Sequence, residues 1–216
     1  MIKAVIFDHD GVLVDTEPIQ WTVWNKVLGE YGVVLDKHIW AEKARGSTTR
    51  EVLKFFLGKK YPTETLENIA HYKTELSYEA SKKAVPIKGV RKFIKLLVTH
   101  GFKIAVASSG DKRKIDYTLS HLQLRQYIST VITQEDIVHP KPNPEIFLKA
   151  AQKLGVGPES CVVFEDAFNG LKAAKSARMK TILVESSHSA AETNFELYDY
   201  AIQDFTQISL KHDIFH

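Results

Sequence analysis

Hydrophobic and polar positions divide this chain of 216 residues into three stretches. At the start, the apolar and largely β-branched run Val5-Ile6-Phe7 predicts a buried strand that ends at Asp8. Residues 16–84 carry amphipathic helical patterns, and the remainder of the chain alternates between strand and helix patterns. Such alternation favours the α/β class, in which a parallel sheet is covered by helices on both faces.

The middle stretch is predicted to be all-helical. Thr48 and Glu51 have the spacing of a capping box at the start of one helix, and a further helix is expected from Pro62 to about Lys82. A Pro/Gly break at residues 84–89 then predicts a linker back to the first part of the chain. We therefore expect a core formed by residues 1–15 and 85–216, and a helical cap formed by residues 16–84 at the mouth of the site.

Beyond the linker, the predicted elements alternate regularly. Helices are expected around residues 93–97, 115–122, 144–154 and 170–177, and strands at residues 103–107, 130–133, 161–164 and 181–184, with a last short strand and a helix or tail after residue 199.

Two aspartates, Asp8 and Asp10, follow the first predicted strand directly. The carboxyl edge of a parallel sheet is where open α/β folds build their sites. Two carboxylates this close repel each other unless a metal ion or a shared proton offsets the repulsion. Taken alone, Asp-x-Asp-Gly is also consistent with a simple acidic turn after a strand.

Three further stretches place polar side chains directly after predicted strands. Ser108, Ser109 and the following glycine suit an anion site, although a Ser/Gly turn that caps a helix is the better reading of that tripeptide alone. Lys141 stands between two prolines that restrict its backbone, which suggests a defined target for its charge. Glu165 and Asp166 suit either a site or the first turn of a helix.

Composition limits the possible partners. With 44% hydrophobic and 25% charged residues the chain is ordinary for a soluble globular protein, and its net charge of +3 without a Lys/Arg run gives no support for nucleic-acid binding. The slight positive excess suits a small anionic substrate. No stretch approaches the roughly 20 apolar residues of a membrane span, so we expect a cytoplasmic protein that does not bind membranes. We expect a monomer or a weak homo-oligomer.

Together these stretches resemble, in the same order along the chain, the motifs of the haloacid dehalogenase superfamily. The resemblance is to the β-phosphoglucomutase-like branch of phosphatases and phosphomutases, which carries a helical cap after the first strand. It implies a Rossmann-like core with the first strand central in the sheet, and Mg²⁺-dependent phosphoryl transfer through an aspartyl-phosphate. The matching residues are Asp8-His9-Asp10-Gly11-Val12-Leu13-Val14-Asp15-Thr16, Ser108, Lys141 and Glu165-Asp166.

The resemblance also implies roles for the two aspartates. Asp8 would be the nucleophile, and Asp10 would protonate the leaving oxygen and later activate the group that attacks the aspartyl-phosphate. Asp10 would have to be protonated when the ester binds, which a raised pKa in a closed site allows. An all-oxygen set of ligands for Mg²⁺ would come from Asp8, Asp10 through its carbonyl, Glu165 and Asp166.

The phosphoryl group would be held by four residues. Ser108 would hydrogen-bond its oxygens, and Lys141 would neutralise their charge while contacting Asp8. Backbone N–H groups at Gly11 and Ser109 would complete the cradle.

In the cap, Gly46 and Arg50 match the glycine and arginine of the cap loop in the β-phosphoglucomutase branch, so both are expected to bind substrate. Gln20, a further candidate substrate contact, stands where mutases have a histidine. Because glutamine cannot titrate, this difference favours a phosphatase over a mutase. Arg45, Arg50 and Lys73 each suit a solvated helix charge, and we expect one of them to face the site.

Three hypotheses follow. The leading one is a phosphatase of small phosphorylated metabolites, with sugar phosphates as the first candidates. The alternative is a hexose-phosphate mutase, which returns the phosphoryl group to a sugar phosphate instead of water. A third hypothesis, from another class, is a non-catalytic regulator that keeps the fold and binds a phosphorylated ligand.

Overall fold

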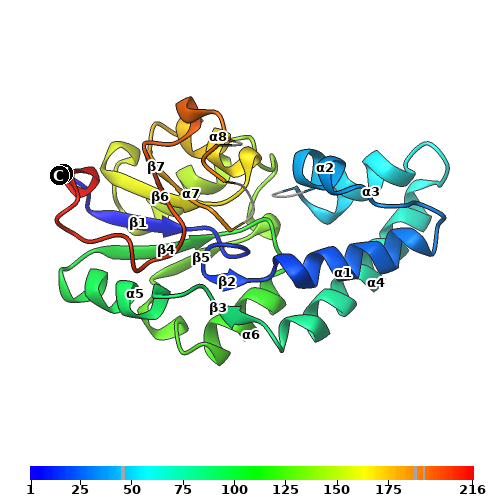
Figure 1. Cartoon of the computed structure of the whole chain (residues 1–216), viewed down its shortest axis with the longest axis horizontal. Helices are drawn as coiled ribbons and strands as arrows, with labels where there is room; N and C mark the ends of the chain where they lie inside the picture. The colour runs from blue at the N-terminus through cyan, green and yellow to red at the C-terminus, as the bar shows by residue number, and fades with distance from the viewer. Residues whose placement is uncertain (45–46, 187–188, 192) are drawn as a thin grey trace.

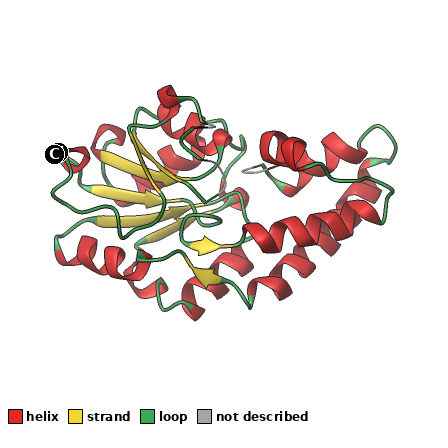
Figure 2. Cartoon of the chain, viewed as in Figure 1, coloured by secondary structure: helices red, strands yellow, loops and turns green. Residues whose placement is uncertain are grey.

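The computed structural model describes residues 1–44, 47–186, 189–191 and 193–216. Its main sheet has six strands: β1 (Ala4–Phe7), β4 (Lys103–Ala107), β5 (Thr130–Ile132), β6 (Cys161–Glu165), β7 (Lys180–Val184) and β8 (Tyr200–Ile202). Their order is β5-β4-β1-β6-β7-β8, and all neighbours are parallel. Helices cover both faces, and a separate helical part lies beyond one edge of the sheet (Figures 1 and 2). The predicted α/β class is confirmed.

The first strand lies at the centre of the sheet, as the family resemblance implied. All four residues of β1 are fully buried: Val5 and Phe7 face one hydrophobic core, and Ala4 and Ile6 face the other. A strand buried on both faces needs a continuous apolar run, and this run is the signal that the sequence carries. The central position places Asp8 in the middle of the carboxyl edge.

Two helices pack on each face of the sheet. The apolar side chains of α5 (Val90–Thr99) and α6 (Lys112–His121) join the core of one face, and those of α7 (Glu145–Leu154) and α8 (Phe168–Ser176) join the core of the other. Each helix also begins or ends beside the carboxyl edge, so its terminal residues are available to a site there.

The helical part has a hydrophobic core of its own. The predicted capping box is present, because Thr48 accepts the backbone N–H of Glu51 while the Glu51 carboxylate accepts the backbone N–H of Thr48. The two longest helices pack against each other, and together with α3 they form a unit beyond the main sheet (Figure 2). Its elements are α1 (Glu17–Gly29), α2 (Lys37–Ile39), the π-helical turn Trp40–Ala44, α3 (Thr49–Leu57) and α4 (Thr63–Ser81).

The two chain segments that join the helical part to the sheet pair with each other. They form the short antiparallel strands β2 (Val14–Asp15) and β3 (Val85–Pro86), which the sequence analysis did not predict. A strand of two residues is too short to show alternation, so its pairing depends on the ends of α1 and α4 being brought together. All the described elements between β2 and β3 are helical.

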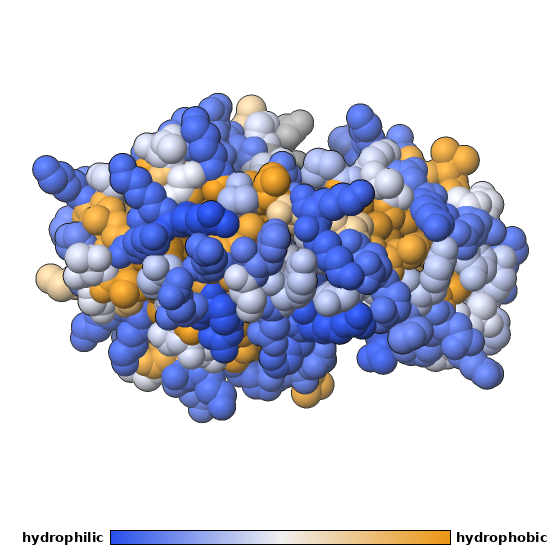
Figure 3. All heavy atoms as spheres, turned by 90° about the horizontal axis from the view of Figure 1, so that it is seen from below, coloured by the Kyte–Doolittle hydropathy of each residue, from blue (hydrophilic) through white to orange (hydrophobic). Residues whose placement is uncertain are grey.

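One face of the outer surface is mostly polar (Figure 3). On the face shown in Figure 3, hydrophilic side chains dominate and apolar residues occur in separate groups. Within the residues that the structure describes, every helix is too short or too polar to span a lipid bilayer.

Candidate active site

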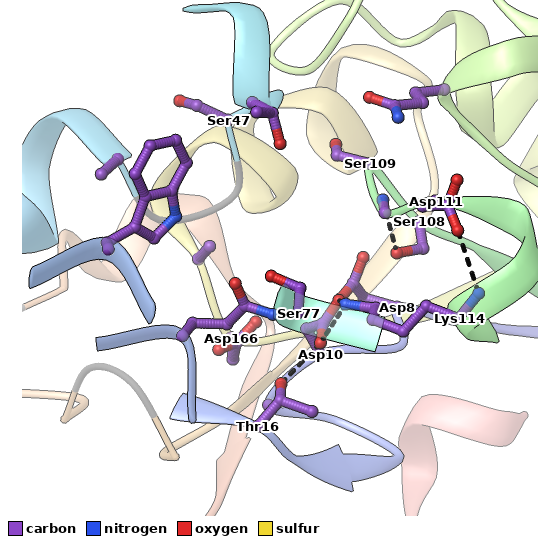
Figure 4. Close-up of a pocket in the computed structure, with 18 of the residues that line it drawn as sticks. Asp8, Asp10, Thr16, Ser47, Ser77, Ser108, Ser109, Asp111, Lys114 and Asp166 are labelled. Carbon is purple, nitrogen blue, oxygen red and sulfur yellow. Dashed lines mark hydrogen bonds and ion pairs between the residues drawn. The ribbon is translucent and has the colours of Figure 1, made fainter. Parts of the chain in front are cut away.

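A pocket lies between the carboxyl edge of the main sheet and the helical part (Figure 4). From the sheet side it is lined by Asp8, Asp10, Gly11, Ser108, Ser109, Glu165 and Asp166, which are predicted site residues from three separate stretches of sequence. The fourth stretch joins them through Lys141, whose ammonium group contacts two of these carboxylates. The structure therefore brings all four motifs to one place.

The innermost part of the site is a buried ion network. Lys141 Nζ lies 2.6 Å from Asp8 Oδ1 and 2.6 Å from Glu165 Oε1, and it also donates to the carbonyl of Ala107 at 3.3 Å. Burial raises the pKa of Asp8 to about 7, although the Lys141 ammonium opposes this rise. Burial alone would lower the pKa of Lys141, but Asp8 and Glu165 outweigh it and raise the pKa. Lys141 is thus a fixed positive charge beside Asp8.

The loop that carries Lys141 is held by one carboxylate. Glu145, at the start of α7, accepts the backbone N–H groups of Val138 and His139 at 3.1 and 2.9 Å. Asn143 accepts the backbone N–H of Glu145, which fixes the start of the helix. The prolines beside Lys141 therefore act together with a side-chain anchor, and the lysine approaches Asp8 from a constrained loop.

Asp10 has different partners from Asp8. Lys114, in the first turn of α6, donates to both Asp10 carboxylate oxygens at 2.8 and 2.6 Å, and Thr16 donates to Oδ1 at 2.6 Å. Burial pushes the pKa of Asp10 upward, but Lys114 and then His9 outweigh it and hold the pKa well below its usual range. This is opposite to the raised pKa that the acid role led us to expect. In this conformation the carboxylate of Asp10 is ionised.

Two turns, at Ser108 and at Gly11, form the part of the pocket where the sequence predicts phosphate binding. Ser108 is buried, and its Oγ accepts the backbone N–H of Gly110 at 3.1 Å, so it shapes the turn while its hydroxyl proton stays available. Asp111 caps α6 by accepting the backbone N–H of Lys114. Gly11 has φ of 76°, and a Cβ there would lie 2.1 Å from Asp166 Oδ2. Only glycine allows this approach of the two loops.

The acidic residues differ in their fitness as metal ligands. Both oxygens of Glu165 are occupied, Oε1 by Lys141 and Oε2 by the backbone N–H groups of residues 166 and 167. Glu165 therefore positions Lys141 and the loop after β6. Each carboxylate oxygen has two lone pairs, so these contacts do not exclude a metal ion, and the role of Glu165 as a metal ligand stays a prediction. Among the described residues, Asp8 Oδ2 has no hydrogen-bond partner, and Asp166 is buried in the same pocket.

A cation fits this corner. Asp8 and Glu165 share the ammonium group of Lys141 there, and a third carboxylate, Asp166, lines the same pocket. Carboxylate oxygens are the ligands that Mg²⁺ prefers. In the part of the chain that the structure describes, no three His, Cys, Asp or Glu side chains form a complete ligand cluster. Mg²⁺ usually binds through one or two carboxylates and keeps several waters, so it does not need such a cluster.

The helical part contributes a second wall of the pocket. Gln20, a predicted substrate contact, lines it, whereas no described hydrogen bond joins its amide to Asp10. Arg50 does not reach the pocket, because its largely exposed guanidinium pairs with Glu67 at 3.0 Å. Gly46 lies outside the described residues, as does Arg45. The other lining residues from this part are Trp24, Trp40, Ala44, Ser47, Thr49, Lys73, Thr74 and Ser77.

Two of the pocket residues on α4 lack polar partners. Lys73 is buried, and its Nζ lies 4.8 Å from the centre of the Trp24 ring without an ion pair among the described residues. Burial and, to a smaller extent, repulsion from Lys114 lower the pKa of Lys73 to about 7. One turn away, the buried hydroxyl of Ser77 has no hydrogen-bond partner in the described structure. Of the two cationic candidates that the structure describes, Lys73 and Arg50, only Lys73 lines the pocket.

The sequence analysis missed Lys114, and it included Thr16 in the first motif without assigning its hydrogen bond to Asp10. Lys114 follows Asp111 in a helix whose inner face also carries Ile115 and Thr118, and this position could have been found from helical spacing. Its pairing with Asp10 could not, because the two residues are 104 positions apart in sequence. His9, between the two aspartates, bonds Thr118 through Nε2 at 2.6 Å and is fully buried away from the pocket.

Comparisons with known proteins agree with this geometry. The family described as haloacid dehalogenase-like hydrolase matches residues 5–184. Fructose-1-phosphate phosphatase YqaB from Escherichia coli (strain K12) is 35% identical over 184 residues, covering 83% of this chain and 94% of that protein. Beta-phosphoglucomutase from Bacillus subtilis (strain 168) is 30% identical over 186 residues, covering 82% and 81% respectively.

A solved structure supports the same fold. Beta-phosphoglucomutase from Clostridium difficile superposes with a TM-score of 0.85 at 24% identity, covering 98% of this chain and 95% of that one. The family match spans both parts of the molecule and all four motifs. The chain therefore belongs to the haloacid dehalogenase-like hydrolases.

Proposed function

We propose that this phosphoric monoester hydrolase is a Mg²⁺-dependent phosphatase of small phosphorylated metabolites, with sugar phosphates as the leading substrate class. The observation that carries the proposal is the 2.6 Å contact of Lys141 with Asp8, next to a pocket that is open to Asp10. A carboxylate, a fixed cation and a second carboxylate at one sheet edge are the parts that phosphoryl transfer to an aspartate requires.

In the first half-reaction, a carboxylate oxygen of Asp8 attacks phosphorus and a new P–O bond forms. The ester P–O bond breaks, and its electron pair leaves on the alcohol oxygen, which takes a proton from Asp10. Lys141 neutralises charge on the phosphoryl oxygens, and the Ser108 hydroxyl donates to one of them. Because Asp10 is ionised in this structure, it must acquire its proton after Lys114 has released at least one of its two hydrogen bonds.

In the second half-reaction, water attacks the phosphorus of the aspartyl-phosphate. Asp10, now ionised, takes a proton from this water, and the bond between phosphorus and Asp8 breaks. Inorganic phosphate leaves and Asp8 is regenerated. Exclusion of bulk water by the helical part determines whether water or a second alcohol reaches the phosphorus.

Phosphatases of this family generally use a divalent metal. In this chain, Asp8 and Asp166 with the backbone carbonyl of Asp10 would hold Mg²⁺, and Glu165 would orient Lys141 beside them. The ion supplies positive charge that offsets the repulsion between the phosphate dianion and the attacking carboxylate.

The proposal is tested by phosphate release from a panel of sugar, nucleotide and organic-acid phosphates, with Mg²⁺ and with a chelator. We expect turnover of small esters that chelation abolishes and added Mg²⁺ restores. Absence of turnover on every ester, including the unspecific substrate p-nitrophenyl phosphate, would contradict the proposal.

A mutase is the second candidate, and the relative named beta-phosphoglucomutase favours it. Against it stands Gln20, which replaces the expected histidine at the hinge. Conversion of glucose 1-phosphate to glucose 6-phosphate that depends on a bisphosphate activator would favour the mutase over the phosphatase.

The non-catalytic regulator makes a different prediction. It requires that Asp8→Asn binds a phosphorylated ligand as the native protein does, and that the native protein turns over no ester in the presence of Mg²⁺. The retained Asp8, Asp10, Ser108 and Lys141 argue against it.

A further inference from the structure

We propose that Lys114 is a specificity-determining residue which, together with Lys73, binds a second anionic group on the part of the substrate that leaves with the alcohol oxygen. This inference rests on the proposed phosphatase function and names its substrate class: phosphate esters that also carry a carboxylate or a second phosphate. Their shared chemistry is an anionic group of two or more oxygens near the ester.

The position of Lys114 ties it to the leaving group. Its side chain is 6% exposed, lines the pocket, and donates to both oxygens of Asp10. If Asp10 serves the leaving oxygen, that oxygen must come within hydrogen-bond distance of Asp10. It then lies beside Lys114 Nζ as well. Substituents next to the ester bond are therefore within reach of this lysine. Figure 4 shows Lys114 and Asp10 together in the pocket.

Approach of the leaving oxygen also disturbs the Lys114 contact. Lys114 occupies both Asp10 oxygens and Thr16 shares one of them, so the leaving oxygen must displace a bond to reach the carboxylate. A buried ammonium that loses a hydrogen bond pays a desolvation cost unless another acceptor replaces it. An anionic group of the substrate can be that acceptor, because the leaving group lies in the same pocket as Lys114. The Asp111 carboxylate accepts the backbone N–H of Lys114 and helps to position this lysine at the pocket.

The opposite wall contributes a second ammonium group. Lys73 reaches the pocket from α4, has no ion pair among the described residues, and is close enough to Lys114 for the two charges to repel each other. Ser77, next to it on α4, adds a buried hydroxyl without a described partner. A single neutral hydroxyl cannot compensate two ammonium groups, whereas an anionic group can accept from both and cancels their repulsion.

The experiment compares kcat/KM within matched pairs of esters in the presence of Mg²⁺. One pair is 3-phosphoglycerate and glycerol 1-phosphate, which tests a carboxylate. The other is propane-1,3-diyl bisphosphate and 3-hydroxypropyl phosphate, which tests a second phosphate. We expect the anionic member of at least one pair to be preferred by about tenfold, mainly through a lower KM, since charge-assisted hydrogen bonds exceed neutral ones by roughly that factor.

Variants then assign the preference to the lysine. Lys114→Met should reduce the ratio within the preferred pair to about one, and Lys114→Arg should retain most of it. The matched control is Lys112→Met, because Lys112 lies on the same helix but is half exposed and pairs with Asp116. The control should keep the native ratio. If Lys114→Met does not fold, as judged by circular dichroism, Lys73→Met provides the same readout.

The outcomes separate this inference from the proposed function. A ratio near one in both pairs for the native protein, with both neutral esters turned over, would overturn the anionic subsite and leave the phosphatase intact. A native preference that persists in Lys114→Met and in Lys73→Met would also overturn it. No turnover of any ester, including p-nitrophenyl phosphate, would defeat the phosphatase proposal itself.

Discussion

The two sides of the pocket differ in how completely their polar groups are satisfied. On the phosphoryl side, Lys141 joins Asp8 and Glu165 in a buried network with contacts of 2.6 Å. On the opposite side, Lys73 and Ser77 are buried without described polar partners. Both sides are desolvated, but only on the first do described ammonium and carboxylate groups pair with each other.

This difference indicates that one side of the pocket serves catalysis and the other selects the substrate. Catalytic groups that act on every substrate gain from being fixed before the substrate arrives, because no reorganisation is then needed during reaction. Groups that select one substrate gain from being left unsatisfied, because the correct ligand then supplies the missing partners. Asp10 and Lys114 lie between the two sides of the pocket. We expect both residues to contact the reacting oxygen as well as the rest of the substrate.

The largest expected effect comes from removing the nucleophile on the complete side. Asp8→Ala should lower kcat by about 10⁴-fold or more, because no other group can form the covalent intermediate. Steady-state phosphate release measures this loss. The exposed Asp116→Ala serves as control and should stay within about twofold of native. Unchanged turnover in Asp8→Ala would defeat the mechanism.

The second largest effect is expected at Asp10, which lies between the two sides of the pocket. Asp10→Ala should lower kcat by about 10²- to 10⁴-fold with a smaller change in KM, because general acid–base catalysis acts on the transition state more than on ground-state binding. Full kinetic curves on one good substrate separate the two constants. A rise in KM with kcat unchanged would assign Asp10 to binding alone.

Lys141→Met tests how much the buried ion network of Lys141, Asp8 and Glu165 contributes to the free energy of unfolding. It leaves two buried carboxylates, Asp8 and Glu165, without their shared ammonium, which should lower the free energy of unfolding by about 3–5 kcal/mol. Denaturant unfolding in a metal-free buffer measures the change. Lys149→Met is the control, because its exposed pair with Glu145 should contribute less than about 1 kcal/mol. Equal stability of the two variants would contradict the network.

Lys73→Met tests the incomplete side and should have the opposite sign. The folded-state pKa of Lys73, about 7, lies below its ordinary 10.5, so folding releases a proton between these values and the penalty is complete below pH 7. Removing the amine should therefore stabilise the protein at pH 6, on the order of 3 kcal/mol, with less gain near pH 10. The exposed Lys54→Met is the control. A less stable Lys73→Met at pH 6 would mean that the ammonium has a stabilising partner.

The smallest effect concerns the loop that presents Lys141. Lys149 and the backbone N–H groups of His139 and Val138 lower the pKa of Glu145 to about 2 from 4.5. Its contribution is therefore present above pH 4.5 and is lost as the pH falls toward 2. Glu145→Gln should lower Tm slightly near neutral pH, and the difference from native should shrink on acidification. A difference that grows at low pH would contradict the anchoring role.

Most of the regular elements were accessible from local pattern. The strand at Lys103–Ala107 was predicted with its observed ends, and the helix at Thr63–Ser81 was predicted within one residue at each end. The apolar pattern of α6 starts only at Ile115, whereas the helix begins at Lys112, because its first turn is polar and adds nothing to that pattern. β2 and β3 went unpredicted because two-residue strands carry no periodic signal.

The features of the site also divide into those that the sequence predicted and those that it did not. Its four motifs were found because each follows a strand whose apolar run is obvious, and parallel strands end at a common edge. The sequence analysis did not find the partners of Asp10, the contacts of Glu165 with Lys141 and with the backbone, or the position of Arg50 at the surface. Each of these three features depends on a side chain of one element contacting a distant element. Residue spacing along the chain does not show which distant elements will lie in contact.

The sequence by itself determined the α/β class and the collection of acidic, hydroxyl and basic side chains at the carboxyl edge, because these follow from hydrophobic periodicity and from residues adjacent in the chain. The central position of the first strand was implied by the family resemblance. Only the tertiary structure decided which ammonium group serves which carboxylate. Lys141 reaches Asp8 across 133 positions of sequence and Lys114 reaches Asp10 across 104. The physical reason is that charge pairing depends on distance and burial in the folded molecule, and both arise only when the separate elements pack together.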